Sequence, residues 1–467
     1  MRLGYVKWMG LWAIVWGTYA VADVVTLSDY LSQVERSHLG IKALGYTQTA
    51  ISNLKLERNT PNQPRLVGQG SIQFSKNYGP MAQFTGPDTQ YQTWAISVAG
   101  ESPSGFGYDV GYSLNYFGYV GSMFGIKSYY QASPYVQITY PLWNNHGGKR
   151  TQQSIRGMDA HYDAMAARAT STQVGILAMA ESTYWRLALA RESVLLSEDA
   201  LDRARRLVEW TRQRQARALG DAADLAQAQA LQKTRELELE MAKSEKKQLE
   251  LDFNWFRGSK PESAVGNIST LTDAITSLKM PVVSDSSSEL RAEMATTEAE
   301  LARLQSQILS GDPVVNLVGR VQLNPVQSEL LGALTHSFAT DYPTYTLALQ
   351  YVSGLDLSLV ASLQEGYQQA KQAAHLQHDQ KRRDRERQLI QLRASLKASK
   401  ERLETMQALE GLMQTKWGLE SQRHRNGRST MAQVLTAEQD YKQVIMQKLR
   451  TKAEIVLTTL QLQVLGR

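Results

Sequence analysis

Cysteine is absent from all 467 residues of the chain. Without a thiol the protein can form no disulfide and carry no thioether-linked lipid, so its stability must come from packing and assembly. Beyond the N-terminal segment, the chain also lacks any uninterrupted apolar run of the roughly 18 residues that indicate a membrane-spanning helix. The sequence therefore predicts neither a lipid anchor nor a transmembrane helix in the mature protein.

Motifs of enzyme active sites are missing as well. The chain contains no His-Glu-x-x-His, no serine-nucleophile elbow and no phosphate-binding glycine loop, and its seven histidines are scattered. His375 and His378 lie on one helical pattern but have no carboxylate-rich partner set, so a solvated helix face explains them better than a metal site. We therefore predict no catalytic residue, no metal site and no cofactor.

The N-terminus has the features of a secretory signal. A positively charged start is followed by an apolar run from Trp8 to Tyr19 and by the small-residue sequence Ala-Val-Ala before Asp23. A transmembrane anchor would need about 20 apolar residues, and Asp23 and Asp29 come too early for one. Residues 1–22 are therefore predicted to be a cleavable signal peptide of an exported protein.

Charge gives little further information. The formal net charge is +6, and the densest basic run, 381–387, is interleaved with acidic residues inside a helical pattern. In an exported protein such a run is better explained as the solvated face of a coiled coil than as a nucleic-acid site. No nucleic-acid partner is predicted.

Proline is absent from two long stretches, 154–217 and 368–426, in which apolar residues recur at heptad spacing. Each stretch ends near a glycine, Gly220 or Gly427, after which a second helical pattern returns. A helix of about 65 residues is on the order of 100 Å long. Such a helix suits a protein that reaches across a distance rather than one that encloses a small active site.

The same order of patterns occurs twice. Residues 23–258 read as helix, strands, long helix, tip and returning helix, and residues 288–467 repeat that order. The region between them, 259–287, has no single period and is interpreted as an irregular connection with a short helix near 272–278. The sequence therefore predicts a duplicated long helical hairpin.

Residues upstream of the two tips support the duplication. Superposing the two tip glycines places Trp210 on Trp417. The same superposition aligns leucines at heptad-compatible intervals, which are predicted to be buried between helices: Leu189, Leu196, Leu396 and Leu403.

Between the segments predicted as helices, the sequence has patterns typical of β-strands. The sequence of 65–140 alternates with period two and is rich in glycine and aromatic residues, and 313–353 contains two further runs of this kind. Because only closed sheets satisfy all backbone groups in lipid, the strands indicate a membrane β-barrel. Six strand candidates cannot close a barrel wide enough to meet such helices, so several protomers must share one. Whether the middle pair, about 93–119, belongs to the barrel or forms an extracellular hairpin stays open.

This organisation resembles the TolC family of outer-membrane efflux and secretion channels over nearly the whole mature chain. The resemblance rests on Tyr140 to Gly148, which is similar to the family's strand-exit turn, and on the tip segments 220–228 and 427–437. It implies a homotrimer in the outer membrane of a Gram-negative bacterium, with a shared barrel of twelve strands, four from each chain, and a periplasmic barrel of twelve helices. It also implies passive export in a tripartite efflux pump or type I secretion system, through a periplasmic adaptor protein and an inner-membrane transporter.

Family channels close at their helical tips, and the gate residues can be carried over by position. Asp224 matches the family aspartate that links the coils. Ser429 stands where the family has an arginine, with Arg428 one position earlier, and His424 replaces the tyrosine of the same network. From these positions we predict a closing contact of Asp224 with Arg428 and His424, with ordinary solvated charges of the tip loops as the alternative.

Two further positions depart from the family pattern. Gln433 and Thr436 occupy the places where some members carry two gate aspartates, so the constriction predicted here is polar but not acidic. The tips at Gly220 and Gly427 are the expected docking points of the adaptor. An alternative interpretation is a structural periplasmic coiled coil or adhesin-like trimer without a pore, which explains the helices but gives the strands no role. The cargo is not indicated.

Overall fold

The computed structural model describes residues 24–76, 82–120, 125, 127–217, 221–277, 287–354 and 357–466. The predicted signal peptide and the first tip glycine, Gly220, lie outside the described residues. The chain forms two compact units, one of Met1–Ala43, Gln173–Asp285 and Arg387–Arg467, the other of Leu44–Thr172 and Ser286–Glu386. Each unit takes segments from both halves of the sequence, so the compact units do not coincide with the two sequence repeats.

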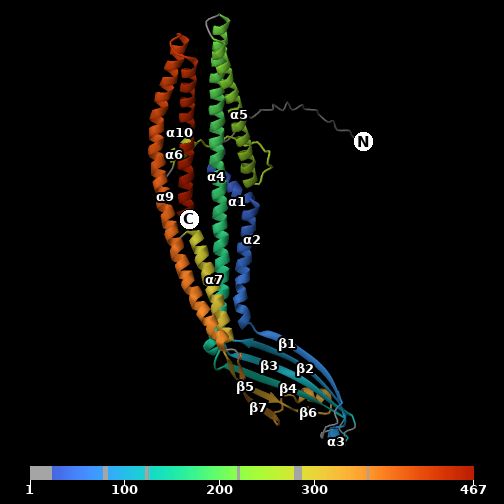
Figure 1. The fold of residues 1–467 in the computed structure, drawn as a ribbon. Helices are drawn as coiled ribbons and strands as arrows, with labels where there is room; N and C mark the ends of the chain where they lie inside the picture. The colour runs from blue at the N-terminus through green and yellow to red at the C-terminus, as the bar shows by residue number, and fades with distance from the viewer. Residues whose placement is uncertain are drawn as a thin grey trace, which may run out of the picture. The chain divides into compact units, whose positions relative to one another are not determined.

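Two very long helices run through both units. They are α4 (Lys149–Ala216, 68 residues) and α9 (Leu357–Arg425, 69 residues), in agreement with the proline-free heptad stretches. In the first unit, α4 is followed by the returning helix α5 (Ala222–Phe256), and α9 by α10 (Met431–Gly466). Figure 1 shows these pairs as two helical hairpins. Gly427 has a positive φ of 71°, which glycine adopts without strain, and it ends α9 at the second tip.

Aromatic packing holds the base of these hairpins together. Helix α1 (Leu27–Ser37) places Tyr30 against Phe253 of α5, with the rings stacked at 4.1 Å between centroids. Tyr184 of α4 donates a hydrogen bond to the carbonyl of Val25 at 2.8 Å and accepts one from the amide of Ser269 at 2.9 Å. The connection between the two halves is thereby fixed to α4. It also contains the short helix α6 (Leu271–Ser277).

The heptad prediction holds on α9. Leu396 and Leu403 are 1% and 8% exposed and pack against Ile455 and Leu462 of α10. These two leucines are therefore seam residues, as the sequence predicts.

On α4 the seam lies on other residues. The positions buried at seven-residue spacing are Leu187, Val194, Leu201 and Val208. Leu189 and Leu196 are only half-buried, so their predicted burial is wrong. The reason is that alanines and serines occupy many core positions of α4, and hydrophobicity alone does not separate the seam from the apolar residues beside it.

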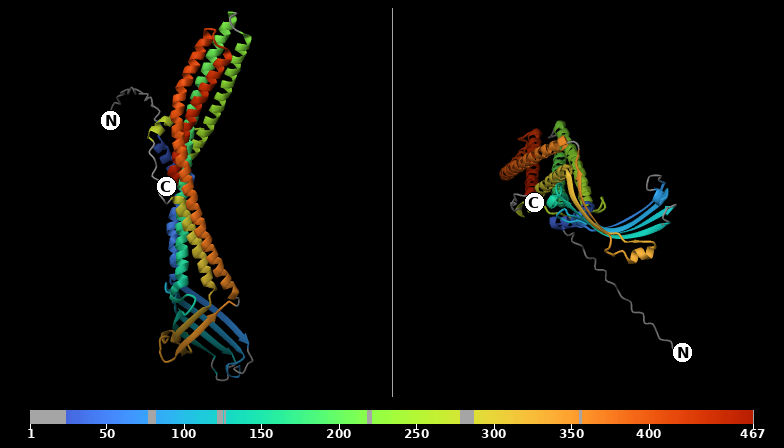
Figure 2. Two further views of the ribbon diagram at one scale, coloured as in Figure 1. Left: turned by 60° about the vertical axis from the view of Figure 1, so that its left-hand side comes forward. Right: turned by 90° about the horizontal axis from the view of Figure 1, so that it is seen from below.

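The strands described in the second unit form one antiparallel sheet, in the order β1-β2-β3-β4-β5-β7. A short strand, β6 (Val326–Gln327), pairs separately with β4. The strands are β1 (Arg65–Lys76), β2 (Asp88–Glu101), β3 (Gly107–Val120), β4 (Ser128–Pro141), β5 (Val314–Leu323) and β7 (Pro343–Val352). The right-hand view of Figure 2 shows the sheet as curved.

The sheet answers the question left open by the sequence. Strands β2 and β3 pair with each other and with their outer neighbours along nearly their whole length. The middle pair is therefore part of the same sheet as the other four strands. The sheet of one chain therefore contains six long strands, two more than the four per chain that the family resemblance implies for the barrel.

Shorter helices complete the second unit. They are α2 (Leu39–Leu54), which begins in the first unit, η1 (Lys55–Asn62), α3 (Ala82–Thr85), η2 (His146–Gly148), α7 (Ser288–Gly311) and α8 (Leu330–Thr335). Ser287 caps the start of α7, because its side chain accepts a hydrogen bond from the amide of Leu290. None of the described helices combines the length and the apolar character that a membrane-spanning helix requires.

Candidate functional site

The sheet has two chemically different faces. One register row crosses all six main strands with apolar or aromatic residues only: Leu66, Val98, Val110, Val136, Val321 and Tyr345. The row one residue away points to the opposite face and is mostly polar: Arg65, Ala99, Asp109, Gln137, Arg320 and Thr346. Alternation of this kind is the pattern of a membrane barrel strand, with an apolar side toward lipid and a polar side toward the lumen.

A polar cluster joins the sheet to the start of α4. The carboxylate of Glu101, at the end of β2, accepts hydrogen bonds from Asn145 and Thr151, both at 2.7 Å. The side-chain oxygen of Asn145 also accepts from the amide of Thr151 at 3.1 Å. Asn144 donates to the carbonyls of Leu309 and Asp312. The strand-exit segment singled out in the sequence is therefore a rigid junction between β2, β4, α4 and α7.

The residues predicted for the gate lie at the helical tips in the first unit. His424 is 4% exposed, and its ring packs edge-on against Trp210 of α4 at 4.8 Å between centroids. Its Nδ1 atom lies 2.7 Å from the carbonyl oxygen of Ser429. His424 therefore joins the two hairpins through Trp210, and no hydrogen bond or ion pair links it to Asp224 among the described residues.

Asp224 and Arg428 are more accessible. Asp224 lies half-buried in the first turn of α5, where a carboxylate is favoured by the helix dipole. Arg428 is exposed directly after Gly427. Within the described part of the chain no ion pair joins them, so the structure does not bring this predicted pair together in a single protomer.

Gln433 and Thr436 begin the returning helix α10, and both are exposed. The Oε1 atom of Gln433 accepts from the amide of Thr430 at 3.0 Å, while Thr430 Oγ1 accepts from the amide of Gln433 at 3.3 Å. This reciprocal pair is a capping box. Thr436 donates to the carbonyl of Ala432, one turn back in the same helix. In one protomer, therefore, Gln433 caps the helix start.

A buried ionic cluster lies deeper between the hairpins, and the sequence reasoning missed it. Glu438 of α10 is 2% exposed and accepts from Arg235 of α5 at 2.5 Å and from Arg203 of α4 at 3.5 Å. Arg203 also pairs with Asp199, and its guanidinium lies 5.7 Å from the ring centroid of Trp417 on α9. We call Glu438, Arg203 and Arg235 the Glu438 cluster, and it contacts all four helices.

Neighbouring charges extend this cluster outward. Glu238 pairs with Arg235 and with Lys442. Burial alone would raise the pKa of Glu238, but hydrogen bonds from Lys442 and Arg235 outweigh burial and lower it. Burial also lowers the pKa of Lys442, an effect that its bond to Glu238 only partly offsets. The Glu238 carboxylate is thus held in its charged form at the half-buried edge of the cluster.

The sequence did contain a signal for the cluster. Arg235 lies seven residues after the buried Ala228, and Glu438 lies seven residues after the buried Met431. A charged residue at a position that otherwise carries apolar side chains in a heptad pattern indicates a buried pair, because an unpaired buried charge is too costly.

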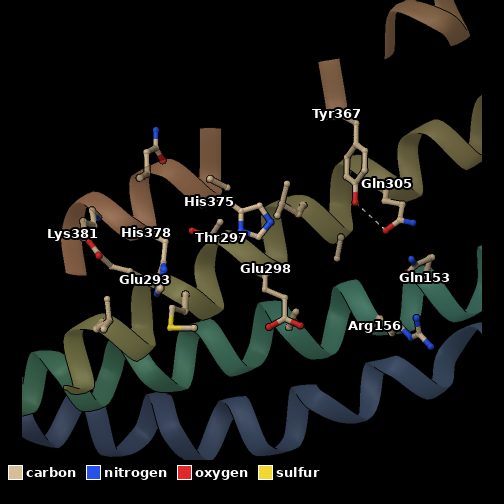
Figure 3. Close-up of a pocket in the computed structure, with 17 residues that line it drawn as sticks. Gln153, Arg156, Glu293, Thr297, Glu298, Gln305, Tyr367, His375, His378 and Lys381 are labelled. Atoms are coloured by element: carbon tan, nitrogen blue, oxygen red, sulfur yellow. Dashed lines mark hydrogen bonds and ion pairs between the residues drawn. The ribbon is translucent and has the colours of Figure 1, made fainter. Parts of the chain in front are cut away.

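A groove of about 550 Å³ lies in the second unit among α4, α7 and α9. Figure 3 shows His375 and His378 on the side of α9 that faces α7, near Thr297 and Glu293. Lys381 pairs with Glu293 across the groove. In the part of the chain that the structure describes, no three metal-binding side chains come together. Both histidines contribute to the wall of the groove.

Comparison with known proteins adds evidence at the level of the fold. No protein-family model matches the sequence, and a search of curated proteins found no match. Solved structures do match: CusC, in a study of folding and transmembrane channel formation, has a TM-score of 0.69 at 12% identity, over 95% of this chain and 92% of that chain. The outer-membrane channel OprN has a TM-score of 0.68 at 14% identity, over 94% of this chain and 90% of that chain.

The outer-membrane protein VceC of Vibrio cholerae also matches, with a TM-score of 0.68 at 14% identity over 94% of this chain and 96% of that chain. The coverage extends over both the helical hairpins and the sheet, which agrees with the predicted fold class of long helical hairpins with a membrane β domain. The chain therefore has the fold of the TolC-like outer-membrane channels.

Proposed function

We propose that this protein is an outer-membrane channel that serves as the passive exit duct of a tripartite efflux pump or a type I secretion system. The observation that carries this proposal is the two-faced sheet, joined through a rigid junction to helices of 68 and 69 residues. The apolar face suits lipid and the polar face suits a water-filled lumen. The helices are long enough, at roughly 100 Å, to extend the conduit deep into the periplasm. Passive movement of a substrate through such a duct requires no catalysis.

The edges of the sheet support assembly with other copies. Every residue of β7 and nearly every residue of β1 is exposed in a single chain. Unpaired backbone groups cannot remain in lipid, so each edge must meet another strand. Strand β1 runs away from the helical end of the sheet, whereas β7 runs back toward that end. The two edge strands therefore have opposite directions, and β1 of one copy can pair antiparallel with β7 of the next. We propose a homotrimer in which this contact closes the barrel.

The tips are the proposed contact with the rest of the machinery. In this proposal a periplasmic adaptor protein docks at the tips around Gly220 and Gly427, and an inner-membrane transporter supplies the energy. Asp224 and Arg428 form a charge-assisted contact between neighbouring chains that keeps the entrance closed. His424 holds the second tip against α4, and Gln433 and Thr436 lie beside a polar constriction. In a single chain Arg428, Gln433 and Thr436 are exposed and Asp224 is half-buried, so all four remain accessible to such contacts.

Membrane fractionation and planar-bilayer recording test the proposal together. The protein is expected in the outer-membrane fraction as a trimer that resists detergent until heated, and the purified trimer should give discrete conductance steps. A trimer without conductance would favour the alternative of a structural coiled coil or adhesin. A detergent-solubilised monomer with complete secondary structure would contradict the shared barrel.

A further inference from the structure

We infer that the membrane barrel of this protein has eighteen strands, wider than the twelve-stranded barrel that the family resemblance implies. The inference rests on the proposed trimer and adds the strand number. Three copies of a six-stranded sheet give eighteen strands, provided that β2 and β3 lie in the barrel wall. Three features of the structure place them there.

The first feature is register. Strand β2 pairs with β1 over twelve consecutive residues and with β3 over fourteen. Strand β3 pairs with β4 over twelve. Each of the four is 12 to 14 residues long, and about 9–11 residues suffice to cross a membrane as a tilted strand. A hairpin projecting from the membrane would leave β1 and β4 to pair with each other, whereas here β2 and β3 separate them.

The second feature is the continuity of the apolar face. On β2 the exposed apolar residues Trp94, Ile96 and Val98 alternate with Thr93, Ala95 and Ser97. Val98 and Val110 lie in the same register row as Leu66 of β1 and Val136 of β4. A hairpin surrounded by water has no reason to carry this row, but a barrel strand in contact with lipid requires it.

The third feature is the turn between β2 and β3. A Cβ atom added at Gly105 in this turn would lie 2.5 Å from the backbone oxygen of Asn145, and one added at Gly148 would lie 2.0 Å from that of Pro103. Both glycines have positive φ. The turn is therefore packed against the junction with α4, where Glu101 is also bound. Strands β2 and β3 thus extend to the same inner level as β4, as wall strands must.

The consequence is a wide, weakly charged exit. Barrel diameter grows roughly in proportion to strand number, and barrels of 16–18 strands enclose an aqueous channel, so eighteen strands give about 1.5 times the diameter of twelve. The lumen-facing side of β2 and β3 carries small or polar residues, namely threonine, serine, asparagine, alanine and glycine, with Asp109 and Glu101 as acidic groups and with Tyr91, Phe117 and Tyr119 toward the far end of the strands. Such an exit admits hydrated polymers, such as polypeptides, as well as small molecules.

Site-specific labelling tests the placement of β2 directly, because the natural chain has no cysteine to interfere. Single cysteines are introduced by Ile96→Cys and Ala95→Cys in β2, and by Leu347→Cys and Thr346→Cys in β7. Each is labelled with a small fluorophore, and the trimers are reconstituted in vesicles that contain lipids with brominated acyl chains. Labels at 96 and 347 should be quenched equally, and labels at 95 and 346 should not.

The outcomes separate the two proposals. Quenching at 347 without quenching at 96 would place β2 outside the membrane and overturn the eighteen-stranded barrel alone. Equal quenching at 95 and 96 would also overturn it, because a wall strand has one lipid face. Absence of quenching at 347 would instead contradict the membrane barrel on which both proposals depend.

Polymer exclusion measures the width. Polyethylene glycols of increasing size are added on the extracellular side of single channels, and the size at which they cease to lower the conductance gives the width of that entrance. A deletion of residues 88–120 removes β2 and β3 and leaves four strands per chain. The natural channel should admit polymers of about 1.5 times the radius. Equal limits in both proteins would overturn the inference, and if the deletion variant does not fold, the quenching pattern decides.

Discussion

Replacing Glu438 by glutamine tests what holds the two hairpins of one chain together. The Glu438 carboxylate is 3% exposed and lies between the guanidinium groups of Arg203 and Arg235, which are 6% and 5% exposed. Glutamine has nearly the same shape but carries no charge, so the substitution leaves two buried cations without their shared anion. The packing volume is unchanged, and the effect measured is electrostatic.

The cost follows from burial. Removing one partner of a buried ion pair destabilises a protein by about 3–5 kcal/mol, because the remaining charge is left uncompensated. Arg235 keeps its bonds to Glu238 at 2.9 and 3.1 Å, and Arg203 keeps its pairing with Asp199. Since these contacts compensate part of the charge, we expect a cost near the lower limit, about 3 kcal/mol.

Asp440→Asn provides a matched control on the same helix. Asp440 pairs with Lys416 at 2.8 Å, but the two side chains are 38% and 47% exposed. Exposed pairs of this kind contribute about 0–1 kcal/mol. The same chemical change, two residues away, should therefore have little effect.

The rate of unfolding is the appropriate measurement, because the proposed trimer is a multi-chain membrane protein and would not unfold in one reversible step. Loss of helical circular dichroism in denaturant should be about 100-fold faster for Glu438→Gln than for the natural trimer, if the cluster breaks before the transition state. Replacing all three cluster residues by leucine or methionine should recover much of the loss, because a well-packed apolar set needs no charge compensation. Equal unfolding rates for Glu438→Gln and Asp440→Asn would refute the reasoning.

Four further predictions follow from particular contacts. Leu403→Ala should destabilise the trimer by about 2–5 kcal/mol and the half-buried Leu196→Ala by less, as compared by their unfolding rates; equal effects would mean that the α9 seam is misassigned. The pKa of Glu238 is lowered in the folded protein from its ordinary value of 4.5, so its contribution to stability is complete above that pH and is lost as the pH falls further; Glu238→Gln should flatten this part of the pH–stability profile. Asp224→Ala and Arg428→Ala should each raise the resting conductance in bilayers, and the double variant should add little to either; unchanged conductance in both single variants would identify them as ordinary solvated charges. Gln433→Ala should cost about 0.5–2 kcal/mol through loss of the capping box, measured as faster hydrogen exchange in the first turn of α10.

The sequence predicted the elements that are encoded locally. Both long helices follow from proline-free heptad patterns, and Leu396 and Leu403 were placed correctly because α9 carries a clear apolar stripe. The alternation of β2, seen around Trp94 to Val98, was also recognised as a strand. These features depend on the spacing of apolar residues over short stretches of the chain, and that spacing can be read from the sequence alone.

Features that depend on contacts between residues far apart in the chain could not be predicted from local sequence patterns. Whether β2 and β3 join the same sheet as β1 and β4 is decided by pairing between strands, whereas the family resemblance implies only four strands per chain. Burial of Glu438 depends on Arg203 and Arg235, which come from two other helices more than 200 residues earlier. Gln433 differs, because its capping box spans only Thr430 to Gln433 and was available in the sequence.

The energies of the tip contacts indicate where an entrance can open at least cost. Within one chain, the α4–α5 and α9–α10 hairpins are joined by the Glu438 cluster, by the Trp210–His424 contact and by Met431, which packs with Val208 and Ala228. Separating these hairpins would expose buried charges at a cost of several kcal/mol, whereas the proposed ion pairs between chains at the exposed tips would be worth about 0–1 kcal/mol each. Opening should therefore separate neighbouring chains and leave each hairpin pair intact. In the Asp224→Ala channel, amide hydrogen exchange around Glu438 should accordingly stay as slow as in the natural protein, and fast exchange there would show that the hairpins of one chain come apart instead.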